Sequence, residues 1–174
     1  DFYLNPPQAD DAIYGVGSAV YGERTKNMLW IDSARHAMSL TFPLLSVSVV
    51  SLVVLLVTNH YEVAFVSEVT SRSMPLYLKV TALWGGQAGS LVFWTWLLAA
   101  FATAVTLRPW DRDREFLPWV IVVTLFTLLF FLFLILFFEN PFARYWQTPS
   151  GIVKSLSAPQ GAVPFVPRDG QGLN

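Results

Sequence analysis

The chain of 174 residues is 54% hydrophobic and 13% charged, whereas ordinary soluble domains are about 25% charged. Its net charge of -1 lacks the basic excess of nucleic-acid-binding proteins. The absence of cysteine excludes disulfides, thiolate metal sites and haem attachment through a Cys-x-x-Cys-His motif in this chain. The composition therefore predicts an all-α, polytopic membrane protein that contacts the lipid bilayer and no nucleic acid.

Residues 1–36 are predicted to form an amino-terminal loop and a partial or interfacial helix. Residues 1–11 carry two prolines and three aspartates without an apolar period, which indicates a surface loop. Residues 12–22 are uncharged, but a helix of that length rises only about 16 Å, roughly half of the hydrocarbon core. We expect them to lie at the interface or to end a helix whose beginning is absent. Because the first residue is Asp1 and not Met, we expect a fragment.

Three transmembrane helices are predicted within residues 37–138. The first covers residues 37–59, which carry no charge and would be about 34 Å long as a helix. The second covers residues 80–107. The third covers residues 116–138 and is the most lipid-like, because phenylalanine and leucine dominate it. The six charges within residues 108–115 predict a solvated hairpin between the second and third spans.

Two further segments lie outside the predicted spans. Polar and apolar residues alternate over residues 62–70, which indicates a short extended piece at the membrane surface. Residues 139–174 contain five prolines, which exclude a regular helix of any length and predict a Pro/Gly-rich loop. Tyr145 and Trp146 suit the aromatic belt at the membrane interface.

The distribution of basic residues predicts the orientation. Basic residues precede the first span or follow the second: Arg24, Lys26, Arg35, Arg108, Arg112 and Arg114. The other side carries Arg72, Lys79, Arg144, Lys154 and Arg168, which are spread more thinly, so the bias is modest. By the positive-inside rule it places the first set in the cytoplasm. The start of the second span and the tail over residues 139–174 would then lie together on the outer, periplasmic face.

The segment most specific for a function begins the second span. Its candidate cofactor-binding residues are Trp84, Gly85, Gly86, Gln87, Gly89, Ser90 and Trp94. Gly85 and Gly89 form a Gly-x-x-x-Gly pair, a spacing that favours close helix packing in lipid. The alternative is that the glycines allow a flat ligand, such as a porphyrin or a quinone, to approach beside an indole ring. By angular position we expect Trp84 to pair with Trp94 or Leu91.

No catalytic or metal-binding residue is predicted in this chain. His36 and His60 lie at opposite ends of the first span, about 36 Å apart in a helix, so they cannot share one metal or haem. We interpret both as interfacial residues rather than axial haem ligands. The chain contains no Ser-His-Asp set, phosphate loop or pair of intramembrane carboxylates, so catalysis by this segment alone is not expected.

Several motifs occur in an order that resembles a known family. They are Ser33-Ala34-Arg35, the segment from Pro75 to Lys79, the segment from Trp84 to Trp94, Asn140-Pro141-Phe142, and the segment from Asp169 to Asn174. The order resembles the amino-terminal portion of the CcmF-type cytochrome c haem lyases, which are membrane proteins that handle haem. The resemblance covers about residues 33–174, and Trp-Gly-Gly-x-x-Gly-Ser is its most specific element.

This resemblance implies a function. The protein would be a multi-pass component of a bacterial inner membrane that handles haem on the outer face and attaches it to apocytochrome c. Its partners would include other cytochrome c maturation membrane proteins. The haem ligands of the family lie beyond the end of this chain, so the residues between Trp84 and Trp94 are candidates for a haem-proximal motif or a packing motif.

Two departures from the family keep a second hypothesis open. The family usually has Glu where Ala88 stands, and it has a complete span before Ser33. Under this second hypothesis, the chain is a non-catalytic membrane scaffold that derives from this family and packs within a larger electron-transfer complex. A gene that continues past Asn174 into a His-Pro-Pro segment and a tryptophan-rich loop would favour the haem lyase, whereas a stop codon there would favour the scaffold. If the motif serves packing, Gly86→Leu is expected to disrupt assembly.

Overall fold

The computed structural model describes residues 7–25, 28–109 and 115–172 and divides the chain into two compact units. Within the described residues, unit 1 covers residues 48–93 and 135–172, and unit 2 covers residues 7–47 and 94–134. Lys26, Arg112 and Arg114, which contribute to the predicted orientation, lie outside the described residues, as do most of the predicted hairpin at 108–115 and the last two residues of the chain.

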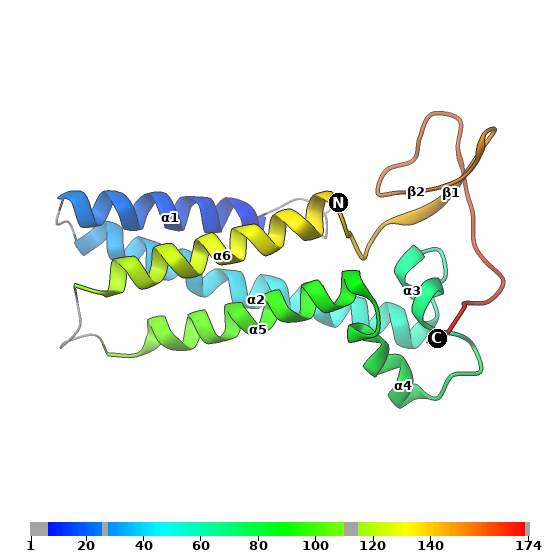
Figure 1. The fold of residues 1–174 in the computed structure, drawn as a ribbon, viewed down its shortest axis with the longest axis horizontal. Coiled ribbons are helices and arrows are strands. Elements are labelled where there is room, and N and C mark those ends of the chain that lie inside the picture. Colours follow the sequence, from blue (N-terminus) through cyan, green and yellow to red (C-terminus); the bar gives the residue numbers. More distant parts are fainter. Residues whose placement is uncertain (1–6, 26–27, 110–114, 173–174) are drawn as a thin grey trace. The chain divides into compact units, whose positions relative to one another are not determined.

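Four long helices account for most of the chain (Figure 1). They are α1 (Pro7–Thr25), α2 (Met28–Thr58), α5 (Gln87–Leu107) and α6 (Leu117–Phe137). The last three contain segments long and apolar enough to cross a membrane, at Leu29–Thr58, Gln87–Leu107 and Leu117–Phe137. The predicted polytopic helical fold with three membrane-spanning helices is therefore confirmed, although the structure also contains a small sheet.

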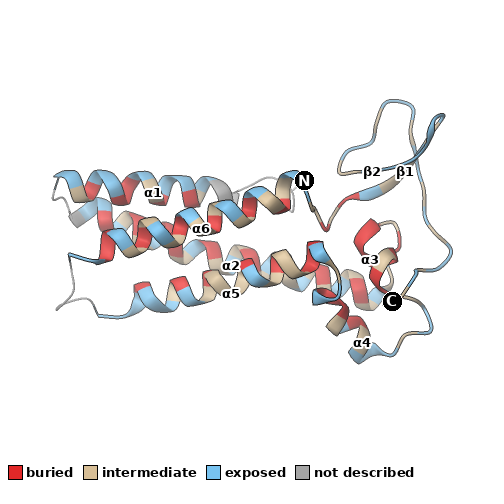
Figure 2. Ribbon diagram, in the orientation of Figure 1, coloured by how far each residue is buried: buried red, intermediate tan, exposed pale blue. Residues whose placement is uncertain are grey.

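Unit 2 is a helical bundle whose core joins residues from all four long helices. Small side chains form the buried side of α1, where Ala12 and Ala19 are fully buried and Gly15 lies against Leu125 of α6. Buried and exposed residues alternate along each helix, as Figure 2 shows. Many large apolar side chains on the outer sides are exposed, among them Phe126. An apolar outer side suits lipid as the surrounding solvent.

The beginning of the chain differs from the sequence prediction. Helix α1 starts at Pro7, so residues 7–11 do not form the loop predicted for residues 1–11. Proline at the first helical position and Asp10 in the first turn both favour a helix start. Residues 12–22 form the middle of this helix, with a buried side in the bundle. Helix α2 begins at Met28, earlier than the predicted span at 37–59.

The second predicted span is divided into several pieces in unit 1. Before α5 come a short helix, α4 (Leu76–Thr81), and a single 3-10 turn, η1 (Ala82–Trp84). The helical structure is interrupted at Gly85 and Gly86, and α5 starts at Gln87. The predicted span at 80–107 therefore begins in a different helix from the one that it ends in.

Another short helix, α3 (Ala64–Val69), occupies the segment for which the sequence predicts an extended piece at residues 62–70. Almost every residue of α3 is buried, so its conformation is determined by contacts on several sides rather than by an alternating pattern. Within residues 62–70, Val63 forms an isolated antiparallel β-bridge with Arg144.

The tail forms no helix within residues 139–172, as its prolines predict, but it contains a sheet that the sequence did not predict. Strand β1 (Arg144–Thr148) pairs in antiparallel register with β2 (Gly151–Ser155) on one side and β3 (Val163–Pro164) on the other. Between β1 and β2 the chain turns over two residues, and Gly151 has a φ of 132°, which glycine adopts without strain.

Candidate functional site

The candidate site is the Trp-Gly-Gly motif, residues 84–90, which joins η1 to α5 in unit 1. The backbone N–H of Gly85 donates to the carbonyl of Ala82 at 3.0 Å, which closes the 3-10 turn. The Ser90 hydroxyl donates to the carbonyl of Trp84 at 2.9 Å. The second bond ties the first turn of α5 back to the end of η1, so the break in the helix has a defined geometry.

Two glycines of the motif face the aromatic ring of Phe65 in α3. A Cβ atom at Gly86 would lie 2.8 Å from Cε2 of Phe65 and 3.0 Å from Cγ1 of Val69. A Cβ atom at Gly89 would collide with both the Leu83 carbonyl oxygen and the Phe65 ring. Phe65 is only 1% exposed. The glycines therefore allow α3 to pack closely against the start of α5.

The aromatic residues of the motif keep exposed faces. Trp84 is 49% exposed, and its ring lies 5.6 Å from that of Phe93. Phe93, which the sequence pattern did not single out, is thus a ring partner of Trp84. Gln87 is exposed, and so is Trp94, which belongs to unit 2. One side of the motif is occupied by α3, while Trp84, Gly85 and Gln87 remain accessible.

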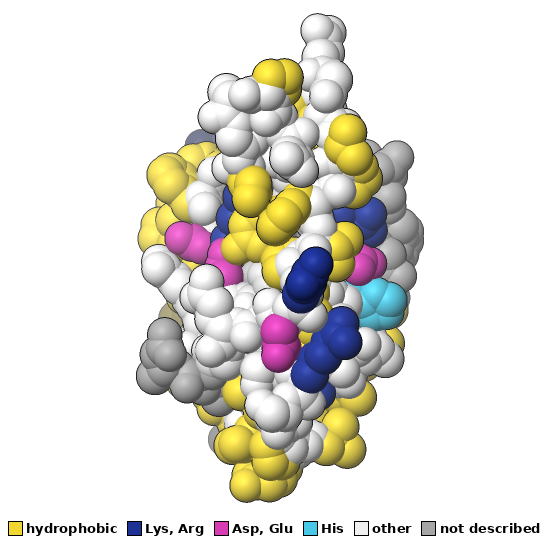
Figure 3. All heavy atoms as spheres, turned by 90° about the vertical axis from the view of Figure 1, so that its right-hand side faces the viewer, with side chains coloured by type: hydrophobic (Ala, Val, Ile, Leu, Met, Phe, Trp, Pro, Cys, Tyr) yellow, Lys and Arg dark blue, Asp and Glu magenta, His cyan; other side chains and the backbone are white. Residues whose placement is uncertain are grey.

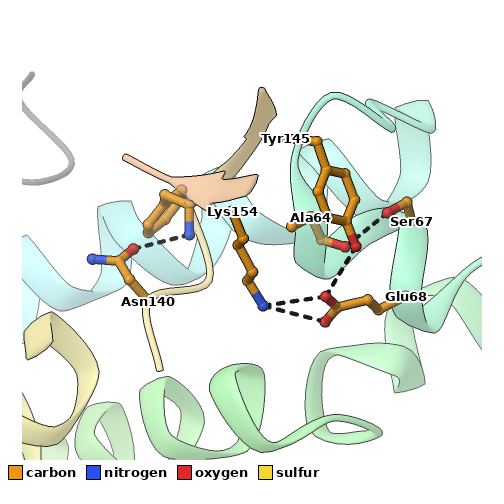
Figure 4. Close-up of polar contacts among 7 residues, drawn as sticks. Ala64, Ser67, Glu68, Asn140, Tyr145 and Lys154 are labelled. Atoms are coloured by element: carbon orange, nitrogen blue, oxygen red, sulfur yellow. Dashed lines mark hydrogen bonds and ion pairs between the residues drawn. The ribbon is translucent and has the colours of Figure 1, made fainter. Parts of the chain in front are cut away.

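Polar contacts hold the tail against α3, as Figure 4 shows. The Tyr145 hydroxyl donates to Glu68 at 3.1 Å, and the Lys154 ammonium group forms an ion pair with the same carboxylate at 3.2 Å. Burial raises the pKa of Tyr145 and outweighs the lowering effect of a hydrogen bond with Ser67. The Ala64 N–H also donates to the carbonyl of Ala143 at 2.8 Å. Glu68 thus connects α3 to both β1 and β2.

The end of the tail forms a second attachment, the tail latch, which we define as residues 169–172. Its Asp169 carboxylate accepts hydrogen bonds from the backbone N–H groups of Arg72 at 2.9 Å and Gly170 at 2.8 Å. These two bonds hold the pKa of Asp169 below its ordinary value. Because the charged form is the better acceptor, the latch is strongest when Asp169 is ionised.

The tail latch also binds the backbone at the end of α3. Gln171 N–H donates to the Ser67 carbonyl at 2.7 Å, and Gly172 N–H donates to the Thr70 carbonyl at 3.2 Å. A side chain at Gly170 would collide with the Thr70 carbonyl oxygen. The Asp169-Gly170 pair of the sequence motif therefore brings the tail into direct contact with α3.

Lys79 is a buried cation that the sequence reasoning did not single out. It is 6% exposed, and its ammonium group donates to the side-chain oxygen of Asn59 at 2.6 Å. The Tyr61 hydroxyl donates to the same oxygen at 3.2 Å. Asn59 has a φ of 57°, the left-handed conformation that ends α2. A lone lysine beside a long apolar run is the sequence signal that would have identified it.

Acidic and basic side chains lie next to one another on the face drawn in Figure 3, with hydrophobic side chains around them. In unit 1 the Arg72 guanidinium lies 5.9 Å from the centre of the ring of the buried Tyr61. Burial raises the pKa of Tyr61, and the negative charge of Asp169 raises it further. This phenol is therefore neutral at physiological pH.

The described residues include exposed aromatic side chains at the motif and two histidines, each beside a polar group. Within the described ranges, no group of three or more His, Asp or Glu residues could hold a metal ion. His36 Nδ1 lies 2.7 Å from the Asp32 carbonyl oxygen, and His60 Nδ1 lies 3.1 Å from Glu62. Tryptophan and glycine do not ligate haem iron. The motif therefore fits contact with the face or edge of a porphyrin and does not fit iron ligation.

Several known proteins are similar to this chain in sequence. No family model matches the chain. It is 29% identical over 125 residues to the cytochrome c-type biogenesis protein CcmF of Haemophilus influenzae, covering 72% of this chain and 19% of that protein. It is 26% identical over 146 residues to CcmF of Pseudomonas fluorescens, covering 84% of this chain and 20% of that protein. The chain thus spans about a fifth of the length of these curated relatives.

A solved structure shares the fold. The structure of the cytochrome c haem lyase CcmF matches with a TM-score of 0.69 at 19% identity, over 78% of this chain and 23% of that one. The similarity in sequence and the similarity in fold agree with each other and with the order of the motifs. Over the aligned part, the chain is similar in sequence and fold to the CcmF-type cytochrome c biogenesis proteins, and the resemblance seen in the sequence is confirmed.

Proposed function

We propose that this chain is part of a haem lyase that handles haem on the outer face of a bacterial inner membrane for attachment to apocytochrome c. Other cytochrome c maturation membrane proteins would be its partners. The similarity to CcmF proteins supports a role in cytochrome c biogenesis. The observation that carries the role within this system is the exposed face of Trp84 at the break between η1 and α5, where Gly86 and Gly89 pack on Phe65 of α3.

The proposed orientation rests on the basic residues of unit 2. Arg24 lies in the last turn of α1, and Arg35 lies near the start of α2, where its guanidinium donates to the Thr106 carbonyl at 2.6 Å. Arg108 follows the end of α5. By the positive-inside rule these ends are cytoplasmic. The Trp-Gly-Gly motif and the tail, which both belong to unit 1, would then lie on the periplasmic face.

The residues of this chain would position haem rather than activate it. Haem, when bound, supplies the vinyl groups to which the cysteine thiols of apocytochrome c are joined. The indole face of Trp84 offers a stacking surface, and Gly85 leaves the neighbouring backbone open to close approach. The ring of Phe93 lies 5.6 Å from the indole of Trp84, and this contact limits the orientations that Trp84 adopts.

The test uses the full-length protein in cells that make c-type cytochromes. We expect Trp84→Ala to lower the level of covalently attached haem while the protein accumulates normally. Trp119→Ala is the matched control, because Trp119 is similarly exposed but lies in α6 of unit 2. Unchanged cytochrome c levels in Trp84→Ala, or a purified assembly without haem absorption, would contradict the proposal.

A second candidate, a non-catalytic scaffold, is supported by Ala88. This alanine is buried in the core of unit 1, at the position where the family usually has Glu. The scaffold hypothesis predicts that deletion of the gene leaves c-type cytochromes intact but prevents assembly of a partner complex. The haem-lyase hypothesis predicts the loss of c-type cytochromes.

A further inference from the structure

A cavity with a volume of about 550 Å³ lies in unit 1. One wall is the last part of α2, including Val50 and Val54. Another part of the lining comes from the tail and includes Phe142 and Leu156, with Arg144 and Trp146 of β1. We call it the α2–tail cavity. It is separate from the Trp-Gly-Gly motif, none of whose residues lines it.

The α2 wall of the cavity belongs to a membrane-spanning segment. Val50 and Val54 are 61% and 51% exposed and lie one helical turn apart, so they face outward on the same side of α2. Thr58 ends the helix about 6 Å beyond Val54 along its axis. The cavity therefore lies near the level at which a span leaves the hydrocarbon and meets the lipid headgroups.

The tail wall supplies a cation and an aromatic residue typical of this level. Arg144 is exposed, and within the described ranges its guanidinium forms no ion pair or side-chain hydrogen bond. Lys154 of the same sheet, by contrast, is paired with Glu68. The Trp146 indole N–H donates to the Ser155 carbonyl at 3.1 Å, which fixes the half-buried ring in the wall. Tryptophan is enriched at membrane interfaces for this amphipathic character.

We propose that the α2–tail cavity binds an anionic phospholipid, with an acyl chain against Val50, Val54 and Leu156 and the phosphate against Arg144. A guanidinium binds a phosphate through two parallel hydrogen bonds, and none of the described residues that line the cavity carries a carboxylate to compete for it. The apolar walls match an acyl chain and not a free phosphate ion. The proposal is independent of haem handling, because it uses none of the residues proposed to contact haem.

The test measures lipid binding by native mass spectrometry of the purified full-length protein in detergent. Phosphatidylglycerol and phosphatidylcholine with identical acyl chains are added in separate experiments. We expect the wild type to retain phosphatidylglycerol in preference to phosphatidylcholine. Arg144→Gln should lower the retention of phosphatidylglycerol about fivefold and remove the preference. Arg168→Gln is the matched control, because Arg168 is an exposed arginine of the same tail outside the cavity.

A second pair of variants tests the acyl-chain wall. Val54→Trp fills the cavity and should reduce the retention of both lipids. Val47→Trp, at an exposed position of α2 outside the cavity, should have no effect. Equal retention of phosphatidylglycerol by the wild type and Arg144→Gln, or no effect of Val54→Trp in a protein that is folded by circular dichroism, would overturn the proposal. A loss of haem absorption in Val54→Trp would also overturn the proposal, because that loss would identify haem as the occupant of the cavity.

Discussion

Unit 1 and unit 2 share α2, α5 and α6 but are stabilised by different interactions. The core of unit 2 consists of alanine, leucine and other apolar side chains of four helices, and its outer sides are apolar as well. Unit 1 combines a buried apolar cluster that includes Tyr61 and Phe65 with hydrogen bonds and an ion pair from the tail to α3. Apolar helix packing accepts many residues of similar size, whereas glycine contacts and hydrogen bonds require particular residues.

The largest effect on stability is expected at Phe65, the residue on which Gly86 and Gly89 of the motif pack. We expect Phe65→Ala to lower the free energy of unfolding by about 3 to 5 kcal/mol, because it leaves a cavity in the core of unit 1. Phe126→Ala is the control, since Phe126 is exposed on α6 of unit 2. Thermal unfolding in lipid nanodiscs measures both variants, and similar losses in the two would contradict the burial of Phe65 in the core of unit 1.

A smaller but still large effect is expected at Gly89. Gly89→Ala should cost about 3 kcal/mol, because the new methyl group meets the Leu83 carbonyl oxygen, which belongs to the backbone and cannot rotate away. Gly17→Ala is the matched control in α1, where nothing lies within 4 Å of the added carbon. That substitution should be neutral or slightly stabilising, because alanine favours a helix. A stable Gly89→Ala protein would show that α5 does not pack on η1 as described.

Gly86 gives a sharper test through a double-mutant cycle. Gly86→Ala alone should cost about 1 to 2 kcal/mol, because its methyl group meets the side chains of Phe65 and Val69. In the Phe65→Ala background the extra cost should largely disappear, since the ring is gone. Gly89→Ala should keep most of its cost in that background. Additive effects of Gly86→Ala and Phe65→Ala would contradict the proposed contact, whereas Gly86→Leu is expected to disrupt assembly outright.

The contacts between the tail and α3 should each contribute less than the glycine packing. Tyr145→Phe removes the hydrogen bond to Glu68 and is expected to cost about 1 kcal/mol. Lys154→Met should cost less than about 1 kcal/mol, because this ion pair is partly exposed. Chemical denaturation of the purified protein measures both variants. A larger loss for Lys154→Met than for Tyr145→Phe would contradict this order.

The smallest expected effect is a pH dependence of the tail latch. The pKa of Asp169 is lower in the folded protein than its ordinary value of 3.8, because two backbone N–H groups donate to the carboxylate. Its stabilising contribution is therefore complete above the ordinary value and is lost as the pH falls through the lowered value. Between pH 5 and pH 2 the unfolding temperature should fall more for the wild type than for Asp169→Asn. Identical curves would show that the latch carries no charge-dependent stability.

The membrane spans were the most predictable part of the fold. Lipid requires long uncharged segments, and that requirement is visible in residues 37–59, 80–107 and 116–138 without knowledge of tertiary contacts. The helix start at Pro7 was also encoded, because proline at the first position and Asp10 in the first turn favour it. The abundance of proline and aspartate in residues 1–11 led instead to the prediction of a loop.

The short elements of unit 1 were not predictable in the same way. Helix α3 has only six residues, and both Phe65 and Val66 are buried against other segments, so a two-residue alternation did not describe it. The candidate site was found in part, because the sequence singled out Gly86 and Gly89. Their partner Phe65 precedes them by about 20 residues, and Glu68 and Tyr145 are 77 residues apart. Such pairs are determined by the tertiary fold and leave no local pattern.

The orientation of unit 1 is the claim on which the proposed function depends most directly, and one labelling measurement tests it. Because this chain contains no cysteine, Gln87→Cys introduces a single thiol here at an exposed position of the Trp-Gly-Gly motif. We expect a membrane-impermeant maleimide to label Gln87→Cys in cells with an intact inner membrane, and to label Arg108→Cys only after that membrane is permeabilised. Labelling of Arg108→Cys in intact cells, with Gln87→Cys protected until permeabilisation, would contradict the account.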